Sequence, residues 1–322
     1  MSAPKIIVTR KLPAPVEERL KSLFTVALNP QDVPFGKGKL IKALAQADGL
    51  LCCVTDPIDA EILQANETPA TKILANFGVG TNHIDLETAE DLDIAVTNTP
   101  GVLDDATADL AMALILATTR RMWMHESRLR RGDWAGFDLV SGLGTSIRGK
   151  TLGIIGMGRI GTALAQRAFY GFGMNVLYYN RSKVVVPSLP AAKAAASVDE
   201  VMAQADVISL HVPGHAENRH LIGAKQIAAM KPTAHLVNTA RGDVIDEAAL
   251  LEALQKGSIA GAGLDVFEAE PHVPEALRAL ENVTLLPHIG SATLETRIAM
   301  GMCAVDNLVA FFDGKTPPNQ VN

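Results

Sequence analysis

The sequence contains little cysteine, and this scarcity excludes a disulfide-stabilised secreted protein. The three cysteines are Cys52, Cys53 and Cys303; the first two are adjacent in an apolar segment, where strand geometry would point their side chains to opposite faces. We interpret all three as buried structural thiols rather than as metal ligands or redox groups. No metal site is predicted, and we expect the reducing environment of the cytoplasm.

Long apolar runs and basic clusters are also absent. The most apolar segment, residues 110–117, is far shorter than the roughly 20 residues that cross a bilayer, and Asp109 and Arg120 bound it. The first residues lead straight into a β-branched segment without the apolar core of a signal peptide. The net charge of −6, with no clustered Lys and Arg, argues against binding to a phosphate backbone. We expect a cytoplasmic protein with a small-molecule substrate and no membrane or nucleic-acid partner.

Short β-branched runs alternate with segments of helical period along the whole sequence, which predicts an α/β fold with parallel sheets. The length of 322 residues leaves room for about two domains. The predicted strands form two series, at 5–10, 49–54, 72–77 and 94–98, and then at 150–156, 175–180, 206–212, 234–240, 261–267 and 283–288. The predicted helices include 15–24, 38–47, one long helix from about 104 to 131, and a last helix from about 292 to 312.

No strand of the second series follows the last predicted helix, so this helix connects no further strand of that sheet and we place it on the first domain. This gives a substrate domain of residues 1–99 and 290–322. A dinucleotide-binding domain of residues 100–289 would be inserted into it. The hinges would lie near residues 98–101 and 288–291.

Three glycines follow the strand predicted at 150–156 and begin a helix in the pattern GxGxxG. Gly156 would permit the tight turn, Gly158 would let a pyrophosphate approach the backbone, and Gly161 would let helix and strand pack closely. The pyrophosphate would then lie at the positive amino end of the helix. The alternative is a tight turn without a ligand, but strand, glycines, helix and next strand occur in the order that predicts a dinucleotide site.

The residues after the second strand of this series indicate which dinucleotide is bound. An NAD site usually has a carboxylate there, which binds the ribose hydroxyls. This sequence instead has Asn180, Arg181 and Ser182, so no acid repels a 2′-phosphate, Arg181 can pair with it and Ser182 can donate a hydrogen bond. We predict a preference for NADP(H), with NAD(H) as the second cofactor. The alternative is a solvated turn whose arginine contacts no ligand.

An arginine, a glutamate and a histidine follow the last three predicted strands: Arg241, Glu270 and His288. Parallel strands bring their carboxyl ends to one edge of a sheet, so these side chains should meet beside the dinucleotide. A guanidinium can hold the carboxylate of a 2-keto acid and polarise its carbonyl. A histidine can protonate the alkoxide that hydride transfer forms, and a carboxylate beside it favours the imidazolium. The three together predict a nicotinamide-dependent reductase of small 2-keto acids.

Four runs resemble the D-isomer-specific 2-hydroxyacid dehydrogenases: GIIGMGRIG at 153–161, NTARGDVIDEAALLEAL at 238–254, GAGLDVFEAEP at 261–271 and LLPHIGSAT at 285–293. The resemblance covers essentially the whole chain. It implies two Rossmann-like domains with a cleft between them, the smaller one flavodoxin-like, and a homodimer whose cofactor domains pair. It also implies that Arg241 orients the substrate, that His288 is the acid–base and that Glu270 is its partner. Glu268 does not match a catalytic position.

The same resemblance assigns further contacts to substrate and cofactor. The loop at 77–83 matches the family's Gly-rich turn, so Val79 and Gly80 should bind the substrate carboxylate through their backbone N–H groups. Asp265 should contact the nicotinamide carboxamide, and the alternative is a structural acid at the end of a strand. The remaining predicted cofactor contacts are Thr107 near the nicotinamide-side phosphate, Arg159 and Ile160 at the pyrophosphate, His211, Val212 and Pro213 by the adenosine, and Thr239, Ala240, His288 and Gly290 at the strand ends.

Within the family, residues 96–121 and the turn at 180–183 are most similar to the glyoxylate/hydroxypyruvate reductases. The resemblance therefore implies NAD(P)H-dependent reduction of glyoxylate and hydroxypyruvate to 2-hydroxy acids. Two alternatives stay open. One is reduction of 2-ketogluconate or another 2-keto acid by the same residues. The other is a dinucleotide-binding scaffold, like the corepressors of this fold, which would bind the cofactor without turnover.

Overall fold

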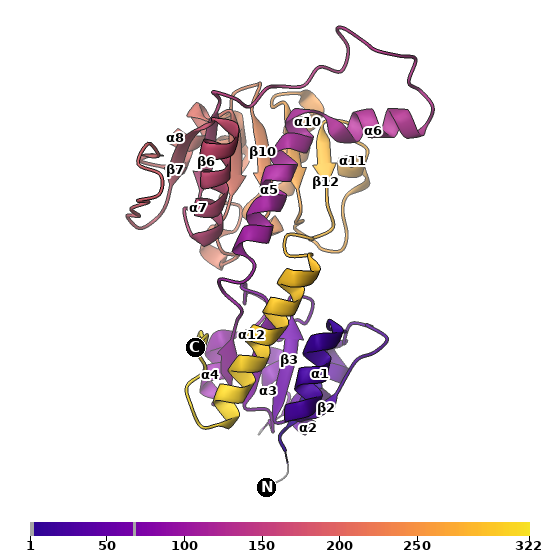
Figure 1. Cartoon of the computed structure of the whole chain (residues 1–322), viewed down its shortest axis with the longest axis vertical. Helices are drawn as coiled ribbons and strands as arrows, with labels where there is room; N and C mark the ends of the chain where they lie inside the picture. Colours follow the sequence, from indigo (N-terminus) through magenta and orange to yellow (C-terminus); the bar gives the residue numbers. More distant parts are fainter. Residues whose placement is uncertain (1–2, 67–68) are drawn as a thin grey trace. The chain divides into compact units, whose positions relative to one another are not determined.

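The computed structural model describes residues 3–66 and 69–322, and the chain divides into two compact units (Figure 1). The smaller unit comprises Met1–Leu103 and Ser291–Asn322, and the larger unit comprises Asp104–Gly290. The larger unit is thus inserted between the two parts of the smaller one, as predicted. The predicted divisions come after residues 99 and 289, and residues 1–2 and 67–68 of the predicted substrate domain lie outside the described residues.

The smaller unit is built on a five-stranded parallel sheet of order β2-β1-β3-β4-β5. Its strands are β1 (Lys5–Val8), β2 (Thr25–Ala27), β3 (Gly49–Cys53), β4 (Ile73–Phe77) and β5 (Ala95–Thr97). This is the order of a flavodoxin-like sheet, which confirms the predicted fold of this domain. The edge strand β2 is absent from the predicted strands, because its three residues are exposed or half-buried and show no buried apolar run.

Helices pack on this sheet and complete the smaller unit. They are α1 (Ala14–Leu23), α2 (Lys37–Gln46), α3 (Ala60–Gln64), α4 (Leu86–Asp91) and α12 (Leu294–Phe312). Leu40 of α2 lies in one buried cluster with Leu50 and Leu74 of the sheet. On α12, Gly301 lies against α1, where a Cβ would come within 2.5 Å of the Val16 side chain. The last helix of the chain therefore belongs to the first sheet.

The larger unit contains a seven-stranded parallel sheet of order β12-β11-β10-β9-β6-β7-β8. Its strands are β6 (Thr151–Ile155), β7 (Asn175–Tyr179), β8 (Lys193–Ala194), β9 (Val207–Leu210), β10 (His235–Asn238), β11 (Gly261–Leu264) and β12 (Val283–Leu285). The first six strands along the chain have the Rossmann order, and β12 extends the sheet beside β11. The strand order reverses at β6, which lies between β9 and β7. Ligands of open parallel sheets bind at such a point, beyond the carboxyl ends of the strands.

The helices of the larger unit include one break that the sequence pattern does not show. They are α5 (Asp104–Thr119), α6 (Met122–Arg130), α7 (Arg159–Gln166), α8 (Val198–Gln204), α9 (Ala224–Ala228), α10 (Glu247–Lys256) and α11 (Glu275–Arg278), with a π-helical turn at Arg167–Gly171 and 3-10 turns at Ala216–Asn218 and Gly242–Val244. The single helix predicted from about 104 to 131 is wrong, because Arg121 is left-handed with a φ of 53°. The carbonyl oxygen of Thr119 accepts a hydrogen bond from the N–H of Thr145 at 2.8 Å. A contact with a residue distant in sequence therefore ends α5.

Helix α5 packs closely on the sheet of the larger unit and is apolar for that reason. Leu114 lies against β11, where a Cβ on Gly263 would be 3.3 Å from the leucine side chain. The hydroxyl of Thr118 donates to the carbonyl oxygen of Ala262 at 3.1 Å. Burial inside the protein thus explains the apolar run at 110–117. In the described part of the chain, no helix is both long and apolar enough to cross a membrane.

Candidate functional site

The glycine turn after β6 has the shape that a dinucleotide needs. Gly156 has a φ of +99°, and a Cβ there would lie 2.5 Å from the carbonyl oxygen of His211. A Cβ on Gly161 would lie 2.2 Å from the carbonyl oxygen of Gly156, so this glycine lets α7 pack on the turn. Around Gly158, by contrast, a Cβ would meet no atom within 4 Å. The turn is therefore open at the start of α7, where the helix dipole favours phosphates.

The side chain of Asn180 fixes the turn that follows β7. Its Oδ1 accepts a hydrogen bond from the backbone N–H of Met157 at 3.1 Å, and its Nδ2 donates to the carbonyl oxygen of Ser182 at 2.9 Å. The turn is thereby tied to the glycine turn. Arg181 lies between these residues in sequence and forms an ion pair with Glu217, from the turn after β9. Glu217 is not among the predicted cofactor residues, because its sequence position gives no sign of this contact.

Three predicted cofactor residues, Thr107, Asp265 and Gly290, come together beyond the carboxyl end of β11. The carboxylate of Asp265 accepts hydrogen bonds from the N–H of Ile289 at 2.7 Å and from that of Gly290 at 2.8 Å. A Cβ on Gly290 would lie 3.6 Å from the hydroxyl oxygen of Thr107. Burial raises the pKa of Asp265, although the two N–H donors oppose this shift. These bonds support the structural interpretation of Asp265, and its contact with a nicotinamide stays a prediction.

The other predicted cofactor residues lie on segments around the same edge of the sheet. They are Arg159 and Ile160 at the start of α7, His211, Val212 and Pro213 after β9, and Thr239 and Ala240 after β10. Burial lowers the pKa of His211 to about 4, so its ring is neutral at neutral pH. Its Nε2 is hydrogen-bonded to the hydroxyl of Ser209 at 2.9 Å. Contacts of these residues with a cofactor stay predictions.

Glu270 and His288 form a hydrogen-bonded pair. Nδ1 of His288 lies 2.8 Å from Oε2 of Glu270, and Oε1 of Glu270 accepts the backbone N–H of Phe267 at 3.0 Å. Burial alone would raise the pKa of Glu270, but the hydrogen bond and charge of His288, the N–H of Phe267 and the charge of Arg241 hold it below its usual value. The carboxylate is therefore ionised at neutral pH and accepts a hydrogen bond from the N–H at Nδ1. Nε2 remains for proton exchange with a ligand.

Arg241 joins this pair because the turns after β10 and β11 pack directly on each other. A Cβ on Gly242 would lie 1.9 Å from the carbonyl carbon of Phe267, so only glycine permits this contact. Nδ2 of Asn238 holds the arginine's turn by donating to the carbonyl oxygen of Arg241 at 2.7 Å. Burial lowers the pKa of Arg241 and the charge of Glu270 opposes this, so the guanidinium stays charged at neutral pH.

The backbone at His288 is left-handed, with a φ of 54°, a conformation that residues other than glycine rarely adopt. The N–H of His288 donates to the carbonyl oxygen of Asp265 at 2.8 Å, and the Asp265 carboxylate binds the next two N–H groups. These bonds fix the turn that presents the imidazole. The sequence pattern assigns no comparable role to Asn238. Its only signal is that asparagine and aspartate at strand ends often hydrogen-bond to nearby backbone.

In the smaller unit, two asparagine amides hold the loop that follows β4. Nδ2 of Asn76 donates to the carbonyl oxygens of Gly78 and Gly80, at 3.1 Å and 2.9 Å, and Nδ2 of Asn98 donates to that of Val79 at 2.9 Å. With these carbonyl groups engaged, the loop has the fixed backbone that anion binding through N–H groups requires. Binding of a substrate carboxylate by Val79 and Gly80 stays a prediction.

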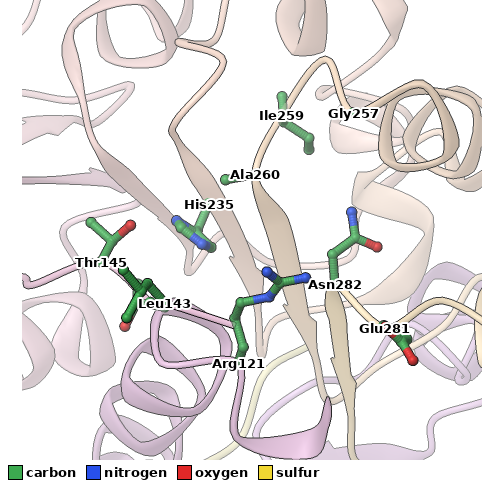
Figure 2. Close-up of a pocket in the computed structure, with 11 residues that line it drawn as sticks. Arg121, Leu143, Thr145, His235, Gly257, Ile259, Ala260, Glu281 and Asn282 are labelled. Carbon is green, nitrogen blue, oxygen red and sulfur yellow. The ribbon is translucent and has the colours of Figure 1, made fainter. Parts of the chain in front are cut away.

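A pocket of about 420 Å³ lies at the opposite edge of the larger sheet (Figure 2). Its lining includes the amino ends of three strands, since His235 begins β10, Ala260 precedes β11 and Asn282 precedes β12. The side chain of Arg121 extends between His235 and Asn282. Burial lowers the pKa of His235 to about 4, so its ring is neutral. None of the predicted site residues belongs to the described lining, so this pocket is separate from them.

The glycine turn and the residues at the carboxyl edge define a class of protein: a dehydrogenase that uses a nicotinamide dinucleotide. A family model supports the same conclusion. The NAD binding domain of the D-isomer specific 2-hydroxyacid dehydrogenases matches residues 112–290. The chain belongs to this family, which confirms the predicted family and fold class.

Full-length relatives extend the similarity to both units. The chain is 45% identical to the glyoxylate reductase of Thermococcus litoralis over 325 residues, covering 99% of this chain and 97% of that protein. It is 43% identical to the glyoxylate reductase of Korarchaeum cryptofilum, covering 99% and 96%. The crystal structure of the NADPH-dependent glyoxylate/hydroxypyruvate reductase of Sinorhizobium meliloti, in complex with NADP and malonate, matches with a TM-score of 0.88 at 37% identity, covering 99% of this chain and 97% of that one.

Proposed function

We propose that the protein is an NADPH-preferring reductase of small 2-keto acids, with glyoxylate and hydroxypyruvate as substrates. The observation that carries the proposal is the pairing of Glu270 with His288 beside the half-buried Arg241, at the same sheet edge as the glycine turn. We call these three residues the catalytic set. The activities named for the relatives support the choice of substrates.

Each member of the catalytic set has its own task in this proposal. Arg241 binds the substrate carboxylate and polarises the keto oxygen, because its planar guanidinium offers donors to both. Val79 and Gly80 add backbone N–H donors to the carboxylate. The reduced nicotinamide supplies the hydride that the keto carbon takes up. His288 gives the proton on Nε2 to the oxygen that becomes negative, Glu270 stabilises the imidazolium through Nδ1, and a 2-hydroxy acid results.

The preference for NADPH rests on the turn after β7. Arg181 and Ser182 lie where an NAD site has a carboxylate, and the Arg181 side chain is 79% exposed, so it is accessible to a 2′-phosphate. The space around Gly158 suits a pyrophosphate, which both cofactors share. The cofactor site as a whole therefore fits either dinucleotide, and the arginine favours the phosphorylated one.

Steady-state kinetics with NADPH and NADH test the proposal. We expect turnover with glyoxylate and hydroxypyruvate, and a kcat/KM about tenfold higher with NADPH, which corresponds to one charge-assisted contact. A higher kcat/KM with 2-ketogluconate would move the substrate assignment to a keto sugar acid. A preference for NADH would contradict the assignment of Arg181. Absence of turnover with all three acids would contradict the proposal as a whole.

We also propose a homodimer formed through the larger units, because α6 and the segment after it leave many apolar side chains in water. Phe137 is 91% exposed and Val140 is 81% exposed. The other exposed apolar residues of this segment are Met122, Trp123, Leu129, Trp134, Leu139 and Leu143. A second copy of the chain is the proposed occupant, in line with the pairing of cofactor domains that the resemblance implies.

Light scattering after size-exclusion chromatography tests the homodimer. The wild-type protein should have twice the mass of the chain, and the double variant Phe137→Ser with Val140→Ser should shift toward the monomer. Val185→Ser is the control, because Val185 is also 75% exposed but lies outside this segment. A wild-type monomer, or an equal shift in the control, would contradict the proposed interface.

The thiols support a location in the cytoplasm, which we also propose. Cys52, Cys53 and Cys303 are all free, and burial raises the pKa of each thiol, which keeps it protonated and unreactive. Detection of the protein in fractionated cells tests this location, and recovery outside the cytoplasmic fraction would contradict it.

A further inference from the structure

We infer that Glu217 sets how strongly the protein prefers NADPH to NADH, because it holds the guanidinium of Arg181 that a 2′-phosphate would bind. The inference rests on the proposed function, in which Arg181 is the partner of that phosphate. Glu217 lies in the 3-10 turn Ala216–Asn218 after β9, and Arg181 lies in the turn after β7. Their ion pair joins two segments that are distant in sequence.

The fold brings these residues together from opposite sides of the glycine turn. β7 and β9 both pair with β6, one on each side. The turn after β7 is tied to the glycine turn through Asn180, and the segment after β9 lies against Gly156 at His211. The ion pair of Arg181 and Glu217 therefore spans the carboxyl end of β6, where the ribose and pyrophosphate of a dinucleotide lie in Rossmann sites.

Charge makes Glu217 and a 2′-phosphate compete for one guanidinium. Both are anions that seek the planar N–H donors of arginine, and Glu217 already engages Nη1 of Arg181. A bound 2′-phosphate must displace this carboxylate or share the guanidinium with it, and in both cases two anions repel each other. NADH has a neutral hydroxyl at that position and meets no such repulsion. Glu217 therefore lowers the ratio of the affinity for NADPH to the affinity for NADH, but NADPH is still bound more tightly.

The ion pair is accessible enough for its partners to exchange. The Arg181 side chain is 79% exposed and that of Glu217 is 55% exposed, so water and salt screen the pair. Lys183, in the same exposed turn, takes part in no ion pair among the residues that the structure describes. Lys183 thus leaves the turn with a positive charge that can attract a phosphate, while Glu217 neutralises the charge of Arg181.

Binding of 2′,5′-ADP and 5′-AMP to the full-length protein tests the inference without turnover, because the two fragments differ only in the 2′-phosphate. With Glu217→Gln, we expect the Kd of 2′,5′-ADP to fall about fivefold and the Kd of 5′-AMP to change less than about twofold. Calorimetry at low ionic strength measures both values. The ratio of kcat/KM for NADPH to that for NADH should rise by the same factor, and added salt should reduce the difference.

Glu252→Gln is the matched control, because it removes the same charge from another exposed ion pair, with Lys256 on α10. It should leave the Kd of both fragments unchanged. In a protein that carries Arg181→Ala, Glu217→Gln should lower the Kd of 2′,5′-ADP by a smaller factor than it does in the wild type, because competition for the guanidinium is gone and only the direct repulsion remains.

An unchanged Kd of 2′,5′-ADP in Glu217→Gln, or an equal fall in Glu252→Gln, would overturn the inference. So would a fall of the same factor in the presence of Arg181→Ala. Equal binding of the two fragments by the wild-type protein would instead contradict the proposed NADPH preference. In that case a fall in the Kd of 2′,5′-ADP alone, in Glu217→Gln, would still support the role of Glu217.

Discussion

Two sets of arginine, glutamate and histidine lie beyond the carboxyl edge of the larger sheet, and they are alike in their local chemistry. The second set, which we call the outer set, consists of Arg219, His220 and Glu268. In the outer set the carboxylate lies 2.9 Å from the imidazole, and in the catalytic set the distance is 2.8 Å. The two histidines also share a left-handed backbone, with φ of 51° and 54°. Residue types and pairing distances therefore do not distinguish the two sets.

The surroundings of the two arginines do distinguish them. Burial lowers the pKa of Arg241, whereas the side chain of Arg219 is 56% exposed, so water screens its ion pair. The close contact of Gly242 with Phe267 brings the turn of Arg241 against that of Glu270. Charged groups act more strongly on a substrate where water is excluded. The histidines and glutamates of the two sets are about equally exposed, so desolvation of the arginine, rather than the pairing itself, distinguishes the catalytic set.

The largest effect should follow removal of the proton donor. His288→Ala should lower kcat for glyoxylate about a thousandfold at saturating NADPH, because the alkoxide loses its proton source. His220→Ala removes the equivalent ring from the outer set and should leave kcat within about threefold. Steady-state kinetics of both variants measure the contrast. Equal losses would show that the two sets are not functionally different.

A smaller effect should follow replacement of the arginine by lysine. Arg241→Lys keeps the positive charge but loses the planar fork, so kcat/KM should fall about a hundredfold, with a higher KM and a lower kcat. Arg219→Lys makes the same exchange at an exposed position and should change kcat/KM less than about twofold. Full activity of Arg241→Lys would exclude bidentate binding of the substrate carboxylate by this residue.

The smallest effect concerns stability, where the two sets should behave alike. For Glu268 and Glu270, burial raises the pKa, but the neighbouring histidine and arginine outweigh burial and lower it. Such a carboxylate stabilises the fold above its unfolded pKa, and this contribution is lost as the pH falls through the folded pKa. Glu268→Gln and Glu270→Gln should therefore each cost less than about 1 kcal/mol at neutral pH.

Urea unfolding at neutral pH and at a series of acidic pH values measures this contribution. The difference in the free energy of unfolding between each variant and the wild type should shrink as the pH falls below about 5. Activity should separate the two variants, since only Glu270→Gln removes the partner of His288. A large loss of stability in Glu270→Gln alone would indicate that Glu270 acts mainly in folding.

Much of the fold could be predicted from residue patterns, and the exceptions have local causes. Every predicted strand corresponds to an observed one, because buried parallel strands are continuous apolar runs. The edge strands β2 and β8 escape this rule, since most of their residues are exposed. The break between α5 and α6 was not predicted either, because it depends on a long-range contact in which the N–H of Thr145 donates to the carbonyl oxygen of Thr119.

The candidate site divides in the same way. Arg241, Glu270 and His288 could be expected to meet, since parallel strands deliver their ends to one edge of a sheet. The role of Asn238 could not be predicted, because its hydrogen bond to the carbonyl oxygen of Arg241 holds a turn and is not part of a motif. The contact of Glu217 with Arg181 could not be predicted either, because it joins two loops whose paths depend on the packing beneath them.

The sequence by itself determined the family, the alternation of strands and helices, and the glycine turn at Gly156, because each depends on residues close together along the chain. Only the tertiary structure decided which of the two arginines is desolvated, where α5 ends, and which carboxylate meets Arg181. The reason is physical. Burial and long-range contacts depend on how strands and loops from distant parts of the sequence pack together, and no local pattern of residues records that packing.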